Sequence, residues 1–138
     1  MQQTLAIIGG GASGLCAAVY AAQLGGFDRI LLFERGPRVG RKLLATGNGR
    51  CNLTNACDVE TLLRNQCRNE KFLYSAFRAC TSQDVMAFFE KLGVQLKTER
   101  GNRVFPVSDS AFDISAALER RLKALKVQVL RDRASALE

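Results

Sequence analysis

Three glycines close to the amino terminus have the spacing of a turn that binds the phosphates of a dinucleotide. Gly9, Gly11 and Gly14 follow the apolar run Leu5–Ile8, typical of a buried strand, and precede residues 15–24, typical of a helix with a face of small side chains. In such a turn the first glycine permits the sharp bend, the second lets the backbone approach the pyrophosphate, and the third lets helix and strand pack closely. The amides at the helix start then attract the phosphate charge. These residues therefore predict a dinucleotide-binding turn.

Glu34 stands where a dinucleotide-binding unit places an acid. It ends a second apolar run, Ile30–Phe33, about twenty residues after the glycine turn, where a carboxylate accepts a hydrogen bond from a ribose 2′-hydroxyl. Strand, turn, helix, strand and acid thus follow in the order that the motif requires. A negative charge here disfavours a 2′-phosphate, although the neighbouring Arg35 weakens that argument. An ordinary loop with a surface glutamate is the alternative interpretation.

The polar segment over residues 40–55 has groups suited to a flat heterocyclic ring. Gly47 and Gly49 flank Asn48 and allow the backbone to bend close to a ligand. Residues 35–57 show little periodicity and are predicted to form a loop, and loops of that length are usually functional. A polar surface loop without a ligand is the alternative interpretation. The uncharged donors and acceptors that would suit a flavin edge, and the basic residues that would neutralise a pyrophosphate, are Asn48, Asn52, Thr54 and Asn55, with Arg41 and Lys42.

Composition describes a globular chain with a basic surface. The 138 residues are 47% hydrophobic and 24% charged, with a net charge of +7. A basic excess suits an anionic partner, either a phosphate-bearing cofactor or a nucleic acid, although solvated surfaces also carry it. Five cysteines without zinc-type spacing and the absence of histidine predict reduced thiols and no metal site. No run is long enough to cross a membrane and no signal sequence is recognisable, so we expect a cytoplasmic protein.

Helical spacing of apolar side chains extends through residues 59–92. One predicted buried face carries Phe72, Leu73, Ala76 and Phe77. Thr81 or Ser82 with Asp84 is a plausible helix start, and Gly93 is a plausible helix end. Aromatic residues in these helices are expected in the core rather than at a ligand.

The remaining elements predict an α/β fold, a three-layer Rossmann-like FAD-binding domain with a parallel sheet. Residues 94–98 and 103–105 indicate a β-hairpin, 108–125 a helix, and 127–130 a third strand parallel to the second. Because parallel sheets are covered on both faces, we expect an incomplete domain, the amino-terminal part of a longer protein, with exposed apolar surface that allows self-association. The expected segments are 1–39 for the strand–helix–strand unit, 40–57 for the flavin loop, 58–110 for a helical and hairpin insertion between strands two and three, and 111–138 for the helix and third strand.

The glycine turn, residues 40–55 and residues 103–108 together resemble the BaiN-like (aminoacetone oxidase-like) FAD-dependent flavoproteins of the two-dinucleotide-binding-domain superfamily. The resemblance implies that the glycines cradle the FAD pyrophosphate, that Glu34 binds the adenosine ribose, and that the backbone near Arg133 contacts adenine. Family members continue well beyond this length, so this chain alone is expected to be inactive. The resemblance and the spacing together give these expected cofactor-binding residues: Gly9, Gly11, Ala12, Ser13, Gly14, Glu34, Arg35, Arg41, Lys42, Asn48, Gly49, Arg50, Cys51 and Asn52.

The resemblance implies an FAD-dependent oxidoreductase that reduces an activated C=C bond by hydride transfer from flavin N5. The implied substrate is enone-like or uridine-like, a small molecule or an RNA, with NAD(P)H as a candidate electron donor. The catalytic residue stays unassigned, because Cys51 could donate a proton or could simply pack beside the flavin. Two alternatives remain: a flavin disulfide reductase using Cys51 and Cys57, whose spacing departs from that motif, and a non-catalytic basic nucleic-acid-binding module.

Overall fold

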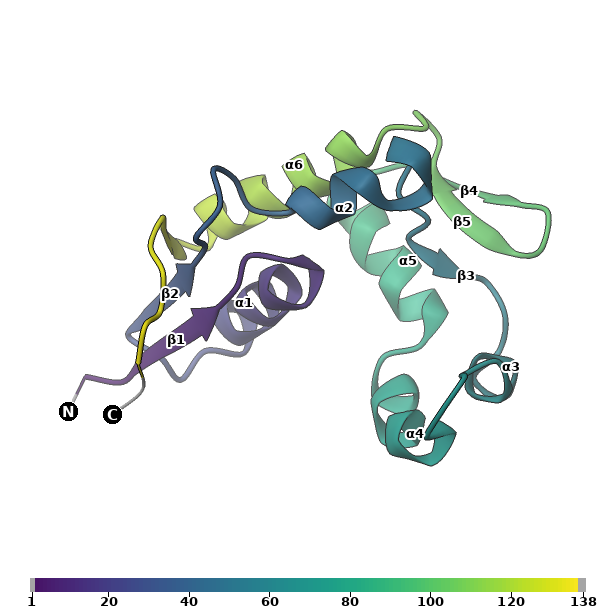
Figure 1. Ribbon diagram of the computed structural model, residues 1–138, viewed down its shortest axis with the longest axis horizontal. Coiled ribbons are helices and arrows are strands. Elements are labelled where there is room, and N and C mark those ends of the chain that lie inside the picture. The colour runs from purple at the N-terminus through teal and green to yellow at the C-terminus, as the bar shows by residue number, and fades with distance from the viewer. Residues whose placement is uncertain (1, 137–138) are drawn as a thin grey trace.

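A parallel three-stranded sheet forms one side of the molecule in the computed structural model, which describes residues 2–136 (Figure 1). Its strand order is β1 (Thr4–Ile8), β2 (Arg29–Phe33), β6 (Gln128–Leu130). β6 pairs in parallel with β2, so the predicted third strand beside the second is confirmed. The predicted α/β Rossmann-like class is confirmed as well.

Two helices cover one face of this sheet, α1 (Ala12–Leu24) and α6 (Ala111–Ala124). Their apolar side chains join those of β2 in a single core. Ala18 and Val19 are completely buried on α1, and such small side chains allow the close approach of α6. The largest buried side chains of this core are Leu15, Leu32, Ile114, Leu118 and Leu122.

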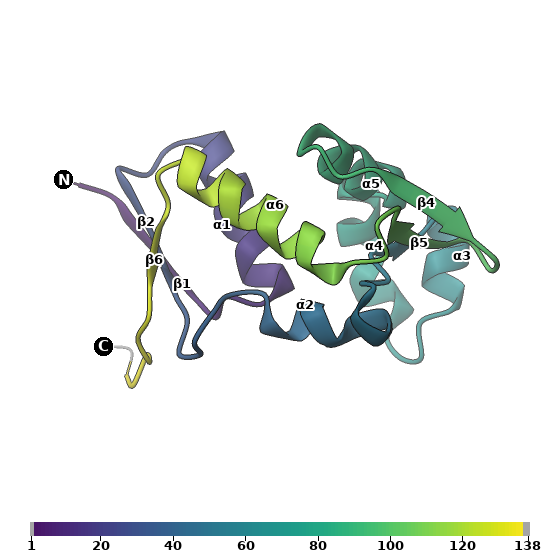
Figure 2. The same ribbon diagram turned by 90° about the horizontal axis from the view of Figure 1, so that it is seen from above.

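The other face of the parallel sheet carries no covering element within residues 2–136 (Figure 2). Ile8 is 56% exposed there and Leu130 37%, while Leu31 and Phe33 are half-buried. The prediction of exposed apolar surface is therefore confirmed. Self-association through that surface stays a prediction.

Between β2 and β6 the chain builds a second, antiparallel sheet and the helices α2 to α6. The sheet order is β3 (Thr54–Asn55), β5 (Arg103–Pro106), β4 (Leu96–Glu99). The predicted hairpin is confirmed, but its first strand starts at Leu96 rather than at residue 94. Val94 is instead buried in the turn after α5, where its amide donates to the Phe89 carbonyl at 3.0 Å.

The helical region 59–92 is divided into α3 (Val59–Arg64), α4 (Glu70–Ala79) and α5 (Ser82–Lys91). Thr81 caps α5 in a capping box with Asp84, as predicted. The prediction that Phe72 and Ala76 are buried is wrong, because Phe72 is 84% exposed and Ala76 is exposed as well, while Leu73 and Phe77 are half-buried. Helical spacing identified the helix but not its orientation on its neighbours.

The prediction of a loop over residues 35–57 is also partly wrong. A short helix, α2 (Arg41–Ala45), a 3₁₀ turn, η1 (Thr46–Gly49), and β3 lie inside that range. Arg, Lys, Leu and Ala all favour helix, and Leu43 and Leu44 pack against the core. The helix propensity of residues 41–45 and this packing form a helix here, although glycines and asparagines follow it.

Candidate functional site

The glycine turn between β1 and α1 has a distinct reason for each glycine. Gly9 has φ +101°, which side chains rarely adopt, and its amide donates to the Phe33 carbonyl at 2.8 Å. A Cβ at Gly14 would lie 1.9 Å from the Gly9 carbonyl oxygen, so α1 packs directly on the turn. Gly11 is different, because its φ of −79° suits any residue and a Cβ there would meet nothing within 4 Å. The fold needs the first and third glycines, whereas Gly11 leaves open space above the backbone.

Glu34 lies beside the turn at the end of β2. Its carboxylate accepts hydrogen bonds from the Gly36 amide at 2.7 Å and from the Gly10 amide at 2.9 Å. The Gly36 amide, with the Gly10 amide and the charges of Arg35 and Lys42, lowers the pKa of this carboxyl below its ordinary value, although burial opposes them. The group is therefore ionised at neutral pH. A carboxylate has about four lone-pair positions, so two remain for a further donor.

A cleft of about 550 Å³ brings many of the predicted residues together. The carboxyl end of β6 closes it, through the segment that holds Arg133. No ion pair within residues 2–136 involves the basic side chains on its wall. The cleft therefore offers positive charge beside an open backbone and one carboxylate. Asp132 and Gly36, which the sequence analysis missed, also line it. The predicted site residues on its wall are Gly9, Gly11, Glu34, Arg35, Arg41 and Lys42.

The first turn of α2 is fixed to the glycine turn through Gly40. The Gly40 amide donates to the Gly10 carbonyl at 2.7 Å. Gly40 has φ +69° and is buried, and a Cβ there would lie 2.6 Å from Ser115 Oγ on α6. This close packing places Arg41 and Lys42 at the cleft. Ala12 and Ser13 form the exposed first turn of α1.

Residues 47–51 form a turn with an unusual backbone, here called the asparagine turn. Four of its five residues have positive φ, including the non-glycine residues Asn48 (+56°) and Cys51 (+59°). Each such non-glycine residue costs on the order of 1 kcal/mol, so the surroundings must hold the turn in place. Asn48, Gly49 and Asn52 are exposed, but none lines the 550 Å³ cleft. The turn lies beyond the opposite end of α2, which at five residues spans roughly 7–8 Å.

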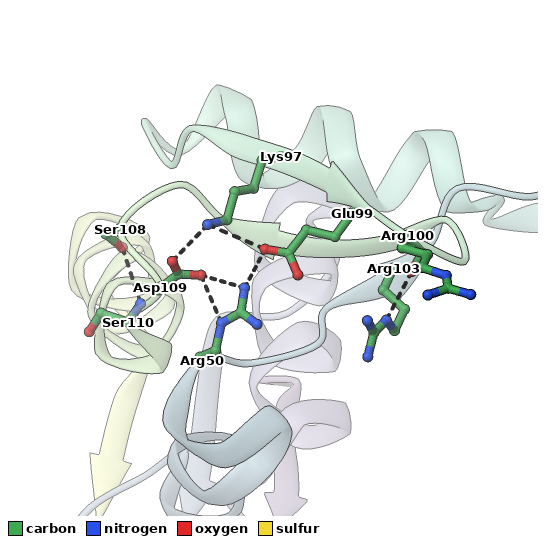
Figure 3. Close-up of polar contacts among 8 residues, drawn as sticks. All are labelled: Arg50, Lys97, Glu99, Arg100, Arg103, Ser108, Asp109 and Ser110. Atoms are coloured by element: carbon green, nitrogen blue, oxygen red, sulfur yellow. Dashed lines mark hydrogen bonds and ion pairs between the residues drawn. The ribbon is translucent and has the colours of Figure 1, made fainter.

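Arg50 leaves the asparagine turn and joins a four-residue ion-pair cluster (Figure 3). It pairs with Glu99 of β4 and with Asp109, whose Oδ1 lies 2.8 Å from Arg50 Nε. Lys97 bonds to the same two carboxylates, at 2.7 Å to Asp109 and 3.4 Å to Glu99. The Arg50 guanidinium also lies 4.1 Å from the centre of the buried Phe105 ring. The predicted cofactor ligand Arg50 is therefore engaged with protein partners in this structure.

The cysteines give little support to thiol chemistry. Cys51 is 1% exposed, which favours the packing alternative over proton donation to a substrate. Burial also raises the pKa of its thiol, which disfavours the thiolate that disulfide chemistry needs. Residues 53–56 run extended beside β5, bonded at Leu53 and Ala56, and so span about 10 Å between Cys51 and Cys57. A disulfide needs Cα atoms within about 7 Å, so this pairing opposes one. Within residues 2–136 the five cysteines are unpaired and no group of three metal-ligating side chains occurs.

Fold and cleft together define a Rossmann-type dinucleotide-binding domain with an inserted antiparallel sheet. A family model described as "HI0933-like protein Rossmann domain" matches residues 3–136. The chain belongs to this family, the BaiN family of flavoprotein oxidoreductases, whose Rossmann domain binds FAD. No helix in the described part of the chain has the length and apolar character needed to span a bilayer.

Curated relatives agree with the family assignment. The chain is 36% identical over 125 residues to 3-dehydro-bile acid delta(4,6)-reductase of Clostridium scindens, covering 91% of this chain and 30% of that protein. It is 35% identical over 108 residues to ribosomal RNA dihydrouridine synthase of Escherichia coli, covering 78% of this chain and 26% of that protein. A third relative, the Haemophilus influenzae ribosomal RNA dihydrouridine synthase, is 32% identical over 99 residues, covering 72% of this chain and 24% of that protein. The chain thus spans less than a third of the length of these relatives.

A solved structure, THI4 of Thermovibrio ammonificans, shares the fold. It superposes with a TM-score of 0.57 at 18% identity, covering 94% of this chain and 37% of that chain.

The cleft fits an FAD pyrophosphate and ribose: the open backbone at Gly11, the ionised Glu34 and the basic wall supply the groups that a dinucleotide requires.

Proposed function

We propose that this chain is the FAD-binding part of an oxidoreductase that reduces an activated C=C bond. Bound flavin would supply the redox chemistry, delivering hydride from N5 to the double bond. The proposal rests above all on Gly11, which has an ordinary φ and no neighbour within 4 Å, and yet carries no side chain. Glycine is also a preferred N-cap residue, and a phosphate approaching the start of α1 accounts in addition for the open space above it.

The chain's own residues would bind and orient the cofactor. Amides at the start of α1 would bind the pyrophosphate, with Arg41 and Lys42 compensating its charge. Glu34 would accept the ribose hydroxyl hydrogen bonds through its remaining lone pairs. The exposed amides of Asn48 and Asn52 would offer uncharged hydrogen bonds to the flavin ring. The ionised Glu34 disfavours a phosphorylated ribose, which suits FAD.

The substrate class follows from the relatives. One is named a bile-acid delta(4,6)-reductase and another a dihydrouridine synthase, and dihydrouridine is uridine with its ring C=C bond saturated. Both products therefore arise by adding two hydrogens across a polarised double bond. We infer an enone-like small molecule or a uridine in RNA as the substrate, with NAD(P)H as the electron donor. The net charge of +7 favours RNA.

Titration of the 138-residue chain with FAD, followed by quenching of flavin fluorescence, tests the cofactor assignment. We expect saturable binding, and we expect Gly11→Val to raise the FAD Kd by about tenfold or more, because a side chain there displaces charge-assisted phosphate contacts. Ala17→Val is the matched control, since residue 17 is exposed on the same helix and outside the cleft. Equal FAD affinity of Gly11→Val and the unmodified chain would refute the pyrophosphate assignment. Salt-sensitive RNA binding without any flavin binding would favour the nucleic-acid-binding alternative.

The complete oxidoreductase that contains this chain, loaded with FAD and reduced without oxygen, should return to the oxidised flavin spectrum on addition of its substrate. An enone and a uridine-containing RNA are compared in that assay, with NADH and NADPH as reductants. If neither compound reoxidises the flavin in the FAD-loaded complete oxidoreductase, the proposed C=C reduction is wrong.

A further inference from the structure

The asparagine turn is held internally by two backbone hydrogen bonds. Within it, the Arg50 amide donates to the Gly47 carbonyl at 3.2 Å, and the Cys51 amide reaches back to the Thr46 carbonyl at 3.0 Å. Neither bond fixes the turn relative to the rest of the molecule. The Cys51 side chain fixes the turn to the rest of the molecule, since it is buried in the core that α1 and α6 share.

The side chain of Arg50 also fixes the turn, through its ion pairs with Glu99 and Asp109. Glu99 lies on β4 and Asp109 lies between β5 and α6, so the guanidinium joins the turn to two elements that are distant in sequence (Figure 3). The Phe105 ring of β5 supports its face at 4.1 Å. Lys97 bonds to both carboxylates from the other side and keeps them in position. The side chains of Arg50, Lys97 and Glu99 are only about one-third exposed, at 33%, 33% and 29%.

We propose that Arg50 is a positioning residue, and that Asp109 and Glu99 hold the asparagine turn through it, so that Asn48 and Asn52 are placed for the flavin ring. This inference rests on the proposed function for its ligand. It assigns the inserted antiparallel sheet a task in cofactor binding, although that sheet contributes no residue to the 550 Å³ cleft. It also replaces the earlier expectation that Arg50 itself contacts the cofactor.

Arginine suits this position better than lysine does. A guanidinium is planar and carries five N–H donors, so it can bond two carboxylates and lie flat on an aromatic ring at the same time. A lysine ammonium at the same place would satisfy the charge but not the planar contact with Phe105. Arg50→Lys should therefore restore only part of what Arg50→Gln loses.

Alkylation of Cys51 tests the positioning role without any cofactor. In the unmodified chain Cys51 is buried, so iodoacetamide should label it slowly, while Cys67 and Cys80 are exposed and label quickly. Peptide mass spectrometry reads each cysteine separately. Arg50→Gln and Asp109→Asn should each raise the Cys51 rate at least about fivefold through local opening of the turn, with Arg50→Lys in between. Cys16 on α1 is half-buried and reports unfolding of the whole domain, so its rate should stay as it is in the unmodified chain.

Arg103→Gln is the matched control, because Arg103 also lies near the Phe105 ring, at 5.9 Å, yet bonds only to the Arg100 carbonyl. It should leave Cys51 protected. If Cys51 labels equally in Arg50→Gln and in the unmodified chain, the turn does not depend on Arg50 and the inference is overturned. If Cys16 opens together with Cys51 in Arg50→Gln and in the isosteric Asp109→Asn, the cluster stabilises the whole domain rather than the turn, which also overturns it.

FAD titration of the same variants tests whether the asparagine turn, once held by Arg50, serves the flavin ring. Positioning predicts that Arg50→Gln and Asp109→Asn raise the FAD Kd several-fold and shift the visible flavin absorbance, with partial recovery in Arg50→Lys. Unchanged Kd and spectrum in variants whose Cys51 has become reactive would show that the turn does not serve the flavin. Absence of FAD binding in the unmodified chain would instead refute the proposed function, while the alkylation result would still report on the turn.

Discussion

Gly14→Ala is the substitution for which the structure sets the clearest magnitude. The new Cβ would lie 1.9 Å from the Gly9 carbonyl oxygen, whereas real Cβ contacts essentially never fall below 3.0 Å, so α1 must move by about 1.1 Å. Both contacting groups are rigid, so no side-chain rotation relieves the clash. Overpacking of this kind costs about 1–3 kcal/mol, offset by at most about 1 kcal/mol from the helix propensity of alanine. We expect a net loss of about 1–2 kcal/mol.

Urea denaturation followed by far-UV circular dichroism measures that loss. Gly11→Ala is the matched control, because its Cβ meets nothing and it should lose less than about 1 kcal/mol, while weakening FAD binding. The two substitutions should therefore have different effects: Gly14→Ala lowers the free energy of unfolding, and Gly11→Ala lowers the affinity for FAD. A Gly14→Ala chain as stable as the unmodified chain would show that α1 does not pack on the turn as described.

Three further predictions concern the core, the acid and the ion-pair cluster. Leu118→Ala removes a side chain that is 1% exposed and should cost about 2–5 kcal/mol in urea denaturation; a loss below 1 kcal/mol would contradict its place in the core. Glu34→Gln should raise the FAD Kd by about tenfold, measured by flavin fluorescence, because the negative charge and one of the hydrogen bonds from the Gly10 and Gly36 amides are lost. An unchanged affinity would show that Glu34 does not belong to the site. Lys97 lowers the pKa of Asp109 and Arg50 lowers the pKa of Glu99, below the ordinary 3.8 and 4.5. Since the folded values lie below the unfolded ones, the cluster stabilises the fold above about pH 4.5 and loses this contribution as the pH falls through the folded values. The melting-temperature difference between the unmodified chain and Asp109→Asn should therefore be constant from pH 6 to 8 and shrink as the pH falls below the ordinary carboxyl values of 3.8 and 4.5; a difference that does not shrink there would exclude this origin.

The parts of the site that depend on local spacing could be predicted from the sequence. The bend at Gly9, the close packing at Gly14 and the place of Glu34 each follow from a short motif whose geometry allows few solutions. The capping box at Thr81 is equally local. The third parallel strand was predicted from the short apolar run over residues 127–130, in a place that the handedness of parallel crossovers allows.

The parts that depend on long-range contacts could not be predicted. Arg50 bonds to residues 49 and 59 positions away, and no periodicity connects them. Likewise, helical spacing placed Phe72 on an apolar face, but only the packing of α4 shows that its ring remains exposed. The helix α2 was missed because the surrounding glycines and asparagines masked five residues of good helix propensity.

The close packing of Gly40 against Ser115 makes the size allowed at each of these two positions, 75 residues apart, depend on the other. A side chain at residue 40 has no room beside Ser115, so a larger residue 115 would press on the backbone of Gly40, whose amide donates to the Gly10 carbonyl of the glycine turn. Drift at either position is therefore constrained by the other. A library that randomises both codons together, selected for flavin retention, should return glycine at 40 paired with small residues at 115.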